Sequence, residues 1–105
     1  LAGTQKHVGT SFSDPAHVAG CFELLHLVAG GEAEWRARPF VSNSNCFVVP
    51  PMKFAEESCI TMEACIRAGM PMLLLSAGQA GATAPAPIAL ASVQAMAECL
   101  AGVVY

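Results

Sequence analysis

The chain has 105 residues, of which 54% are hydrophobic and only 12% are charged, and its net charge is −3. It contains no cluster of lysine and arginine, which excludes a nucleic-acid-binding surface. A small domain normally needs more polar residues to cover its surface, so we interpret the chain as an internal fragment of a larger protein. The five cysteines form no CxxC pair and indicate free thiols in a reducing cytoplasm.

The first predicted unit is a strand over residues 6–11 followed by a helix. Asp14 is a good N-cap, and Pro15 suits the first helical position, where the missing N–H costs no hydrogen bond. Gly30 ends the helix. The apolar stripe of this helix consists of Val18, Cys21, Phe22, Leu25, Val28 and Ala29. A short solvated helical connector then carries two candidate i,i+4 ion pairs, Glu32–Arg36 and Glu34–Arg38.

The second unit begins with a predicted strand over residues 39–44 and a loop over residues 45–51. The helix that follows ends at Gly69. One face of this helix is marked by Phe54, Ser58, Met62, Cys65 and Ile66.

The third unit begins with the apolar run of residues 72–76, which predicts a buried strand, followed by a loop of small residues. Pro85 and Pro87 indicate the first turn of a helix that continues to Tyr105. Its expected inward stripe is Ile88, Ala91, Ala95, Met96, Cys99 and Val103. Because prolines and Glu98 interrupt this apolar segment, we interpret it as a helix inside a larger assembly and not as a membrane span.

The three strands are predicted to start near residues 6, 39 and 72, and this regular spacing of 33 residues is the length of a βα unit. Strands that alternate with helices indicate a parallel sheet. Eight such units would make a (β/α)8 TIM barrel, but a doubly wound sheet fits the same spacing. The residues by themselves leave both α/β architectures open.

Each unit places small polar residues where its strand ends, as expected of a binding face built from βα loops. These residues are Thr10, Ser11, Ser42, Asn43, Ser44, Asn45, Ser76, Gly78, Gln79 and Thr83. The sequence contains no complete set of residues for metal binding, dinucleotide binding or acid–base catalysis. His7, His17 and His26 lack metal-ligand spacing, residues 78–81 lack the GxGxxG pattern, and no paired carboxylates occur at the loop end. Cys46, the one thiol in a strand-end loop, has no base near it in sequence.

Several motifs resemble those of the trimethylamine methyltransferase (MttB) family, and the likeness covers nearly the whole chain. They are Phe12-Ser13-Asp14-Pro15, Ala29-Gly30-Gly31, Arg38-Pro39-Phe40-Val41-Ser42, Val49-Pro50-Pro51-Met52-Lys53, Gly69-Met70-Pro71-Met72 and Ala80-Gly81-Ala82-Thr83-Ala84-Pro85. The last motif is the most specific.

The resemblance implies that residues 1–105 are three consecutive βα units of a (β/α)8 TIM barrel, with parallel strands and outer helices. It implies a cytoplasmic enzyme that moves a methyl group from trimethylamine, or from a quaternary amine such as glycine betaine, to a cognate corrinoid protein. The chain would bind no cofactor directly, because the partner carries the corrinoid, and homo-oligomerisation is left open. The trimethylamine branch of the family uses a pyrrolysine, which this sequence lacks, so the substrate stays open between the two amines.

The residues expected to bind the methylammonium, by their position, are Asn43, Asn45, Gln79 and Thr83, with Phe47 as an aromatic face. No catalytic residue is assigned within the chain. Two alternatives remain beside this reading. One is a fragment of another TIM-barrel enzyme of the lyase type, and the other is a small membrane-associated protein without enzymatic activity.

Overall fold

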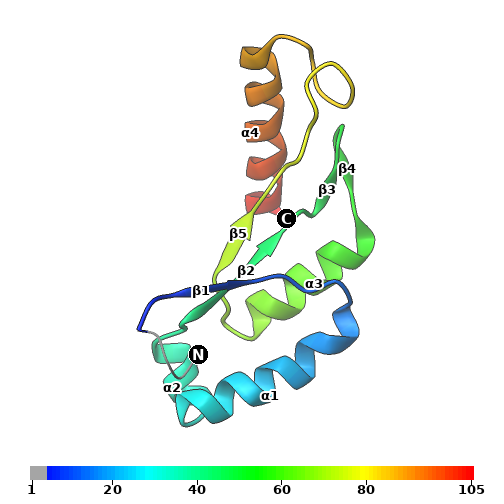
Figure 1. Cartoon of the computed structure of the whole chain (residues 1–105). Coiled ribbons are helices and arrows are strands. Elements are labelled where there is room, and N and C mark those ends of the chain that lie inside the picture. The colour runs from blue at the N-terminus through cyan, green and yellow to red at the C-terminus, as the bar shows by residue number, and fades with distance from the viewer. Residues whose placement is uncertain (1–4) are drawn as a thin grey trace.

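A three-stranded parallel sheet forms the centre of the fold, and the computed structural model describes residues 5–105. The sheet has the order β1-β2-β5, with β1 (Val8–Thr10), β2 (Val41–Asn45) and β5 (Met72–Leu74). An antiparallel hairpin pairs β3 (Val48–Val49) with β4 (Lys53–Phe54). The helices are η1 (Pro15–His17), α1 (Val18–Ala29), α2 (Glu32–Ala37), α3 (Glu56–Arg67) and α4 (Ile88–Val104). Figure 1 shows α1 and α3 on one side of the sheet and α4 beside the segment that follows β5.

The predicted parallel α/β arrangement is confirmed, although each strand is shorter than expected or shifted in sequence. Val8 pairs with Val41, and Asn43 pairs with both Thr10 and Met72. The central strand starts at Val41 and not at residue 39, in keeping with the lack of a backbone N–H in Pro39. A closed barrel is not seen, so the TIM-barrel assignment stays a prediction.

The predicted ends of the first helix are confirmed. The Oδ1 atom of Asp14 accepts a hydrogen bond from the backbone N–H of Ala16 at 2.8 Å, which caps the 3-10 turn that leads into α1. At the other end, Gly30 adopts the left-handed conformation with φ of 95° and ends the helix. Glycine is favoured there because it has no Cβ.

Of the two ion pairs expected in the connector, only one forms. Arg36 Nε lies 2.9 Å from Glu32 Oε1 on α2. The prediction of a Glu34–Arg38 ion pair was wrong, and no such contact exists among the described residues. Arg38 lies beyond the last helical residue with an extended φ of −148°, so its side chain leaves the helical i,i+4 geometry.

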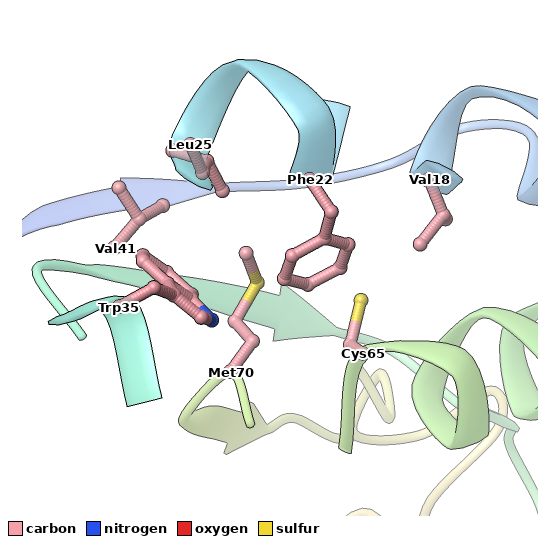
Figure 2. Packing of buried hydrophobic residues seen from close by; sticks show 7 residues of the cluster. All are labelled: Val18, Phe22, Leu25, Trp35, Val41, Cys65 and Met70. Atoms are coloured by element: carbon pink, nitrogen blue, oxygen red, sulfur yellow. The ribbon is translucent and has the colours of Figure 1, made fainter. Parts of the chain in front are cut away.

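The larger core cluster lies between α1, α2, α3 and the sheet (Figure 2). It consists of Val18, Phe22, Leu25, Trp35, Val41, Cys65 and Met70. Trp35 is fully buried, its ring meets Phe22 and Phe40 edge to face, and its indole N–H donates to the carbonyl oxygen of Ala68 at 2.9 Å. The indole therefore fills the core and also satisfies its one donor. The predicted stripe of α1 is confirmed except at Val28, which is exposed.

A second core cluster joins the hairpin to α3 and consists of Phe47, Val48, Cys59 and Met62. The expected burial of Met62 and Cys65 on α3 is confirmed, whereas the prediction for Ile66 was wrong because its side chain is exposed. Phe54 lies in β4 and not on the helix, and it is also exposed. β3 lies within the loop expected over residues 45–51, and β4 follows it after a turn that contains Pro50 and Pro51.

The predicted inward stripe of α4 is confirmed at Ala91, Ala95 and Cys99, which are partly buried, and wrong at its three bulkiest members. Ile88, Met96 and Val103 are exposed, with relative accessibilities of 79%, 62% and 73%. The residues with the least exposure on this helix are Ala91, Gln94, Ala95, Glu98, Cys99, Ala101 and Gly102. Because α4 is apolar on every side, helical periodicity gave no contrast between the two faces.

Gly102 is the place where α4 meets the second core cluster. A Cβ built on Gly102 would lie 2.8 Å from Cε1 of Phe47, closer than two carbon atoms approach. We expect Gly102→Ala to lower the free energy of unfolding by about 1–3 kcal/mol through overpacking, despite the better helix propensity of alanine. Urea denaturation of the full-length protein measures the effect.

Gly20→Ala on α1 is the matched control, because a Cβ there meets nothing within 4 Å. It should raise the free energy of unfolding by about 0.5–1 kcal/mol. Equal effects of the two substitutions would contradict the contact between Gly102 and Phe47.

The cysteines differ in their access to reagents. Burial raises the pKa of Cys65 from its ordinary 9.0 to about 11, against the opposing effect of a hydrogen bond from Asn43. The folded state holds the thiol proton above pH 9, where the unfolded state releases it, so ionisation of Cys65 lowers stability as pH rises. We expect iodoacetamide at pH 8 to label exposed Cys46 in native protein and Cys65 only after denaturation. Peptide mapping by mass spectrometry checks this, and native labelling of both thiols at equal rates would refute it.

Candidate functional site

The carboxyl ends of the three parallel strands lie at one edge of the sheet, as their parallel pairing requires. Ser11, which follows β1, donates its hydroxyl to the carbonyl oxygen of Ser44 at 3.1 Å. Leu75, which follows β5, donates its backbone N–H to the carbonyl oxygen of Asn45 at 3.0 Å. The strand-end residues of all three units are thus held against β2. In α/β proteins this edge is the usual place for a ligand.

Asn43 and Asn45 lie on the face of β2 that α3 covers. Asn45 Nδ2 donates to the carbonyl oxygen of Ser58 at 2.8 Å, and Asn43 Nδ2 lies 3.7 Å from the Sγ atom of Cys65. Both side chains are buried, and Asn43 Oδ1 makes no hydrogen bond within the described structure. The two amides connect the sheet to α3. Their assignment as substrate contacts stays a prediction.

The opposite face of the sheet carries the alternate residues of each strand. Ser42 lies beside Gly9, and Ser44 lies beside Leu73. Gly9 and Leu73 are both exposed, and Leu73 retains 53% of its accessible surface. This face therefore carries the three smallest residues of the sheet, Gly9, Ser42 and Ser44, together with Leu73, and it is exposed at Gly9 and Leu73 but buried at Ser42.

Gln79 and Thr83 lie together in the loop after β5. The backbone N–H of Gln79 donates to Thr83 Oγ1 at 2.9 Å, and its carbonyl oxygen accepts N–H groups of residues 82–84. Gly81 has φ of 81°, a conformation that favours glycine and closes the turn. Both Gln79 and Thr83 are exposed. The structure brings these two predicted site residues together and places both asparagines elsewhere, under α3.

Phe47 is fully buried in the second core cluster. Its ring centroid lies 5.8 Å from that of Phe54, and its edge lies against Gly102. The ring therefore fills space between the hairpin and α4. It presents no accessible aromatic face to a cation in this structure.

Glu98 is a polar residue of this region that the sequence analysis did not select. It is the only described α4 residue that is buried, with 1% of its surface exposed. Its Oε1 atom accepts hydrogen bonds from the backbone N–H of Met52 at 2.9 Å and from Gln94 Nε2 at 3.1 Å, and its Oε2 atom accepts the hydroxyl of Ser76. A signal was present in the sequence, since Glu98 is the one charged residue in an otherwise apolar segment and Gln94 lies one turn earlier.

The hydrogen bonds to Glu98 keep it ionised. Burial by itself raises the pKa of the carboxyl group, but the donors Ser76, Met52 and Gln94 outweigh burial, so the pKa lies below its ordinary value. The sign of the linkage follows from this lowered value. The stabilisation is present above the ordinary pKa of glutamate and is lost as the pH falls through the lowered pKa.

Residues 5–105 carry no sign of two other kinds of site. In that part of the chain, no group of three or more histidine, cysteine or acidic side chains is placed to hold a metal ion. Within the same residues, no helix is both long and apolar enough to cross a membrane.

Comparison with known proteins supplies the family. The profile described as trimethylamine methyltransferase (MTTB) matches residues 1–105. Over 101 residues the chain is 32% identical to the trimethylamine methyltransferase MttB of Desulfitobacterium hafniense. The alignment covers 96% of this chain and 20% of that relative, so the chain spans about a fifth of the relative's length. The chain belongs to the trimethylamine methyltransferase family.

Proposed function

We propose that this chain is part of a cytoplasmic methyltransferase that takes a methyl group from a methylated amine. The substrate is trimethylamine or a quaternary amine such as glycine betaine, and the acceptor is a corrinoid held by a cognate partner protein. The observation that carries the proposal is the family match over all 105 residues. The name of the relative, a trimethylamine methyltransferase, supports the same reaction class over the lyase and the membrane-associated alternatives.

We further propose that residues 1–105 are three βα units of a (β/α)8 barrel. The parallel order β1-β2-β5, with α1 and α3 on one face, supports this arrangement. In such a barrel the face with Gly9, Ser42 and Ser44 would point inward, because helices cover the outside. The loop after β5 would then lie at the carboxyl end of the barrel, where active sites of this fold occur.

The chain's own contribution to the reaction is to bind and orient the amine. When bound, the partner's corrinoid supplies the cobalt that accepts the methyl group. A methylated ammonium group carries a diffuse positive charge and few or no N–H donors. It is therefore held by electrostatic attraction to oxygen atoms in a site from which water is excluded. Gln79 and Thr83 bring an amide oxygen and a hydroxyl to the exposed loop after β5. We assign the substrate contacts of this chain to these two residues first.

The reaction is tested with full-length protein, cob(I)alamin as methyl acceptor, and trimethylamine or glycine betaine in parallel. We expect one of the two amines to lose a methyl group, giving dimethylamine or dimethylglycine, measured by mass spectrometry. The acceptor without the protein is the control. If neither amine is demethylated above this control, the proposed function is wrong.

The loop contacts are tested by Thr83→Val, which keeps the shape of the side chain and removes the hydroxyl that accepts the N–H of Gln79. We expect the KM for the demethylated amine to rise roughly 3- to 10-fold, the effect of losing one neutral hydrogen bond. Ser92→Ala is the matched control, because the Ser92 hydroxyl bonds to the carbonyl oxygen of Ile88 on its own helix. An unchanged KM in Thr83→Val would remove Thr83 from the site.

A further inference from the structure

α4 is attached to the rest of the fold by the carboxylate of Glu98, and stability alone does not explain why a carboxylate is used. Most side chains of α4 are exposed and apolar, and its one buried residue among those described is Glu98. Taking a carboxylate out of water is costly, and a well-packed apolar residue of similar volume often serves stability equally well. A buried carboxylate instead provides directional acceptors for several donors at once.

The donors to Glu98 come from three separate segments. Met52 lies at the tip of the hairpin, with a left-handed φ of 56° that is unusual for a residue other than glycine. Ser76 lies two residues after β5, in the loop that carries Gln79 and Thr83. Gln94 lies on α4 itself, one turn before Glu98. One carboxylate therefore holds the hairpin tip, the β5 loop and α4 together.

Gln94 extends this network to the far end of the same loop. Its Nε2 atom donates to Glu98 Oε1 at 3.1 Å and also to the carbonyl oxygen of Thr83 at 2.9 Å. The loop is thus held near its start, at Ser76, by Glu98 directly and at Thr83 through Gln94. Between these two points lies Gln79, whose backbone N–H is bonded to the Thr83 hydroxyl.

We propose that Glu98 is a positioning residue for the amine-binding loop, and that its carboxylate fixes residues 76–83 so that Gln79 and Thr83 meet the methylated amine. The inference rests on the proposed function. Glu98 acts through Ser76 and Gln94 and does not itself contact the substrate. Loss of the carboxylate should therefore weaken amine binding more than it slows the chemical step, because the reacting atoms lie elsewhere.

The test uses full-length protein with Glu98→Gln, which keeps the side-chain volume but replaces one acceptor oxygen with a donor. The matched control is Glu63→Gln, the same change at an exposed carboxylate that pairs with Arg67 on α3. In ligand-free protein we expect amide hydrogen exchange over residues 76–84 to accelerate at least about tenfold in Glu98→Gln. Exchange in α1 should stay unchanged, and the control should resemble the wild type.

The second measurement is steady-state demethylation with cob(I)alamin as acceptor. We expect Glu98→Gln to raise the KM about tenfold while kcat stays within about twofold of the wild type. Glu98→Asp keeps the charge but shortens the reach, so it should recover part of the loss. If Glu98→Gln does not fold, Gln94→Leu cuts the connection to Thr83 while leaving the carboxylate in place, and it should show the same KM effect.

Two results overturn the inference. One is unchanged exchange over residues 76–84 in both Glu98→Gln and Gln94→Leu. The other is faster exchange throughout the chain with an unchanged KM, which would make Glu98 a residue of general stability. If the wild-type protein demethylates neither amine, the proposed function fails, and the exchange measurement still decides whether Glu98 fixes the loop.

Discussion

The pairing of β2 with both of its neighbours is the constraint that organises this molecule. Within the described sheet, β1 and β5 each pair with β2 and not with one another. Their register with β2 therefore sets the position of both strands along the strand direction. The same register brings Ser11 and Leu75 against the end of β2. Because side chains alternate along a strand, β2 also decides which polar residues meet α3 and which meet the open face.

Two different kinds of attachment follow from this centre. α1, α2 and α3 are held by close packing around Trp35, Phe22 and Met62, which is non-directional and tolerates small adjustments. α4 is held by the hydrogen bonds of Glu98 and by the contact of Gly102 with Phe47. Hydrogen bonds fix angles as well as distances. The loop after β5 therefore takes its shape mainly from polar contacts, whereas α1, α2 and α3 are held mainly by apolar packing, to which Trp35 and Asn45 add single hydrogen bonds.

The features that the sequence predicted correctly are those governed by local chemistry. Proline has a fixed φ that suits a helix start, and glycine is the residue that readily takes a left-handed conformation, so the start and end of the first helical segment followed from residue identity. The three strands and their parallel pairing followed from the regular spacing of the strand starts and from the alternation of strands with helices. The edge at which the strand-end residues meet follows directly from that order.

The features that could not be predicted depend on which face of a strand or helix packs against the rest of the fold. β2 reads Val-Ser-Asn-Ser-Asn, with polar residues on both faces, so nothing in the pattern shows that Asn43 and Asn45 face α3. α4 is apolar on every side, so its buried face was placed wrongly at Ile88 and Met96. Glu98 was visible as a lone charge in that helix, but two of its three donors, Met52 and Ser76, come from segments far away in sequence.

The small residues Gly9, Ser42 and Ser44 affect how much space is left over their face of the sheet. Gly9 and the two serines of β2 add little volume above the backbone, and a Cβ at Gly9 would meet nothing within 4 Å. Bulk at position 9 is therefore limited by whatever occupies the space over the sheet, and not by the packing beneath it. A methyl group added at position 9 would therefore narrow the space over the sheet without meeting the atoms that pack beneath it.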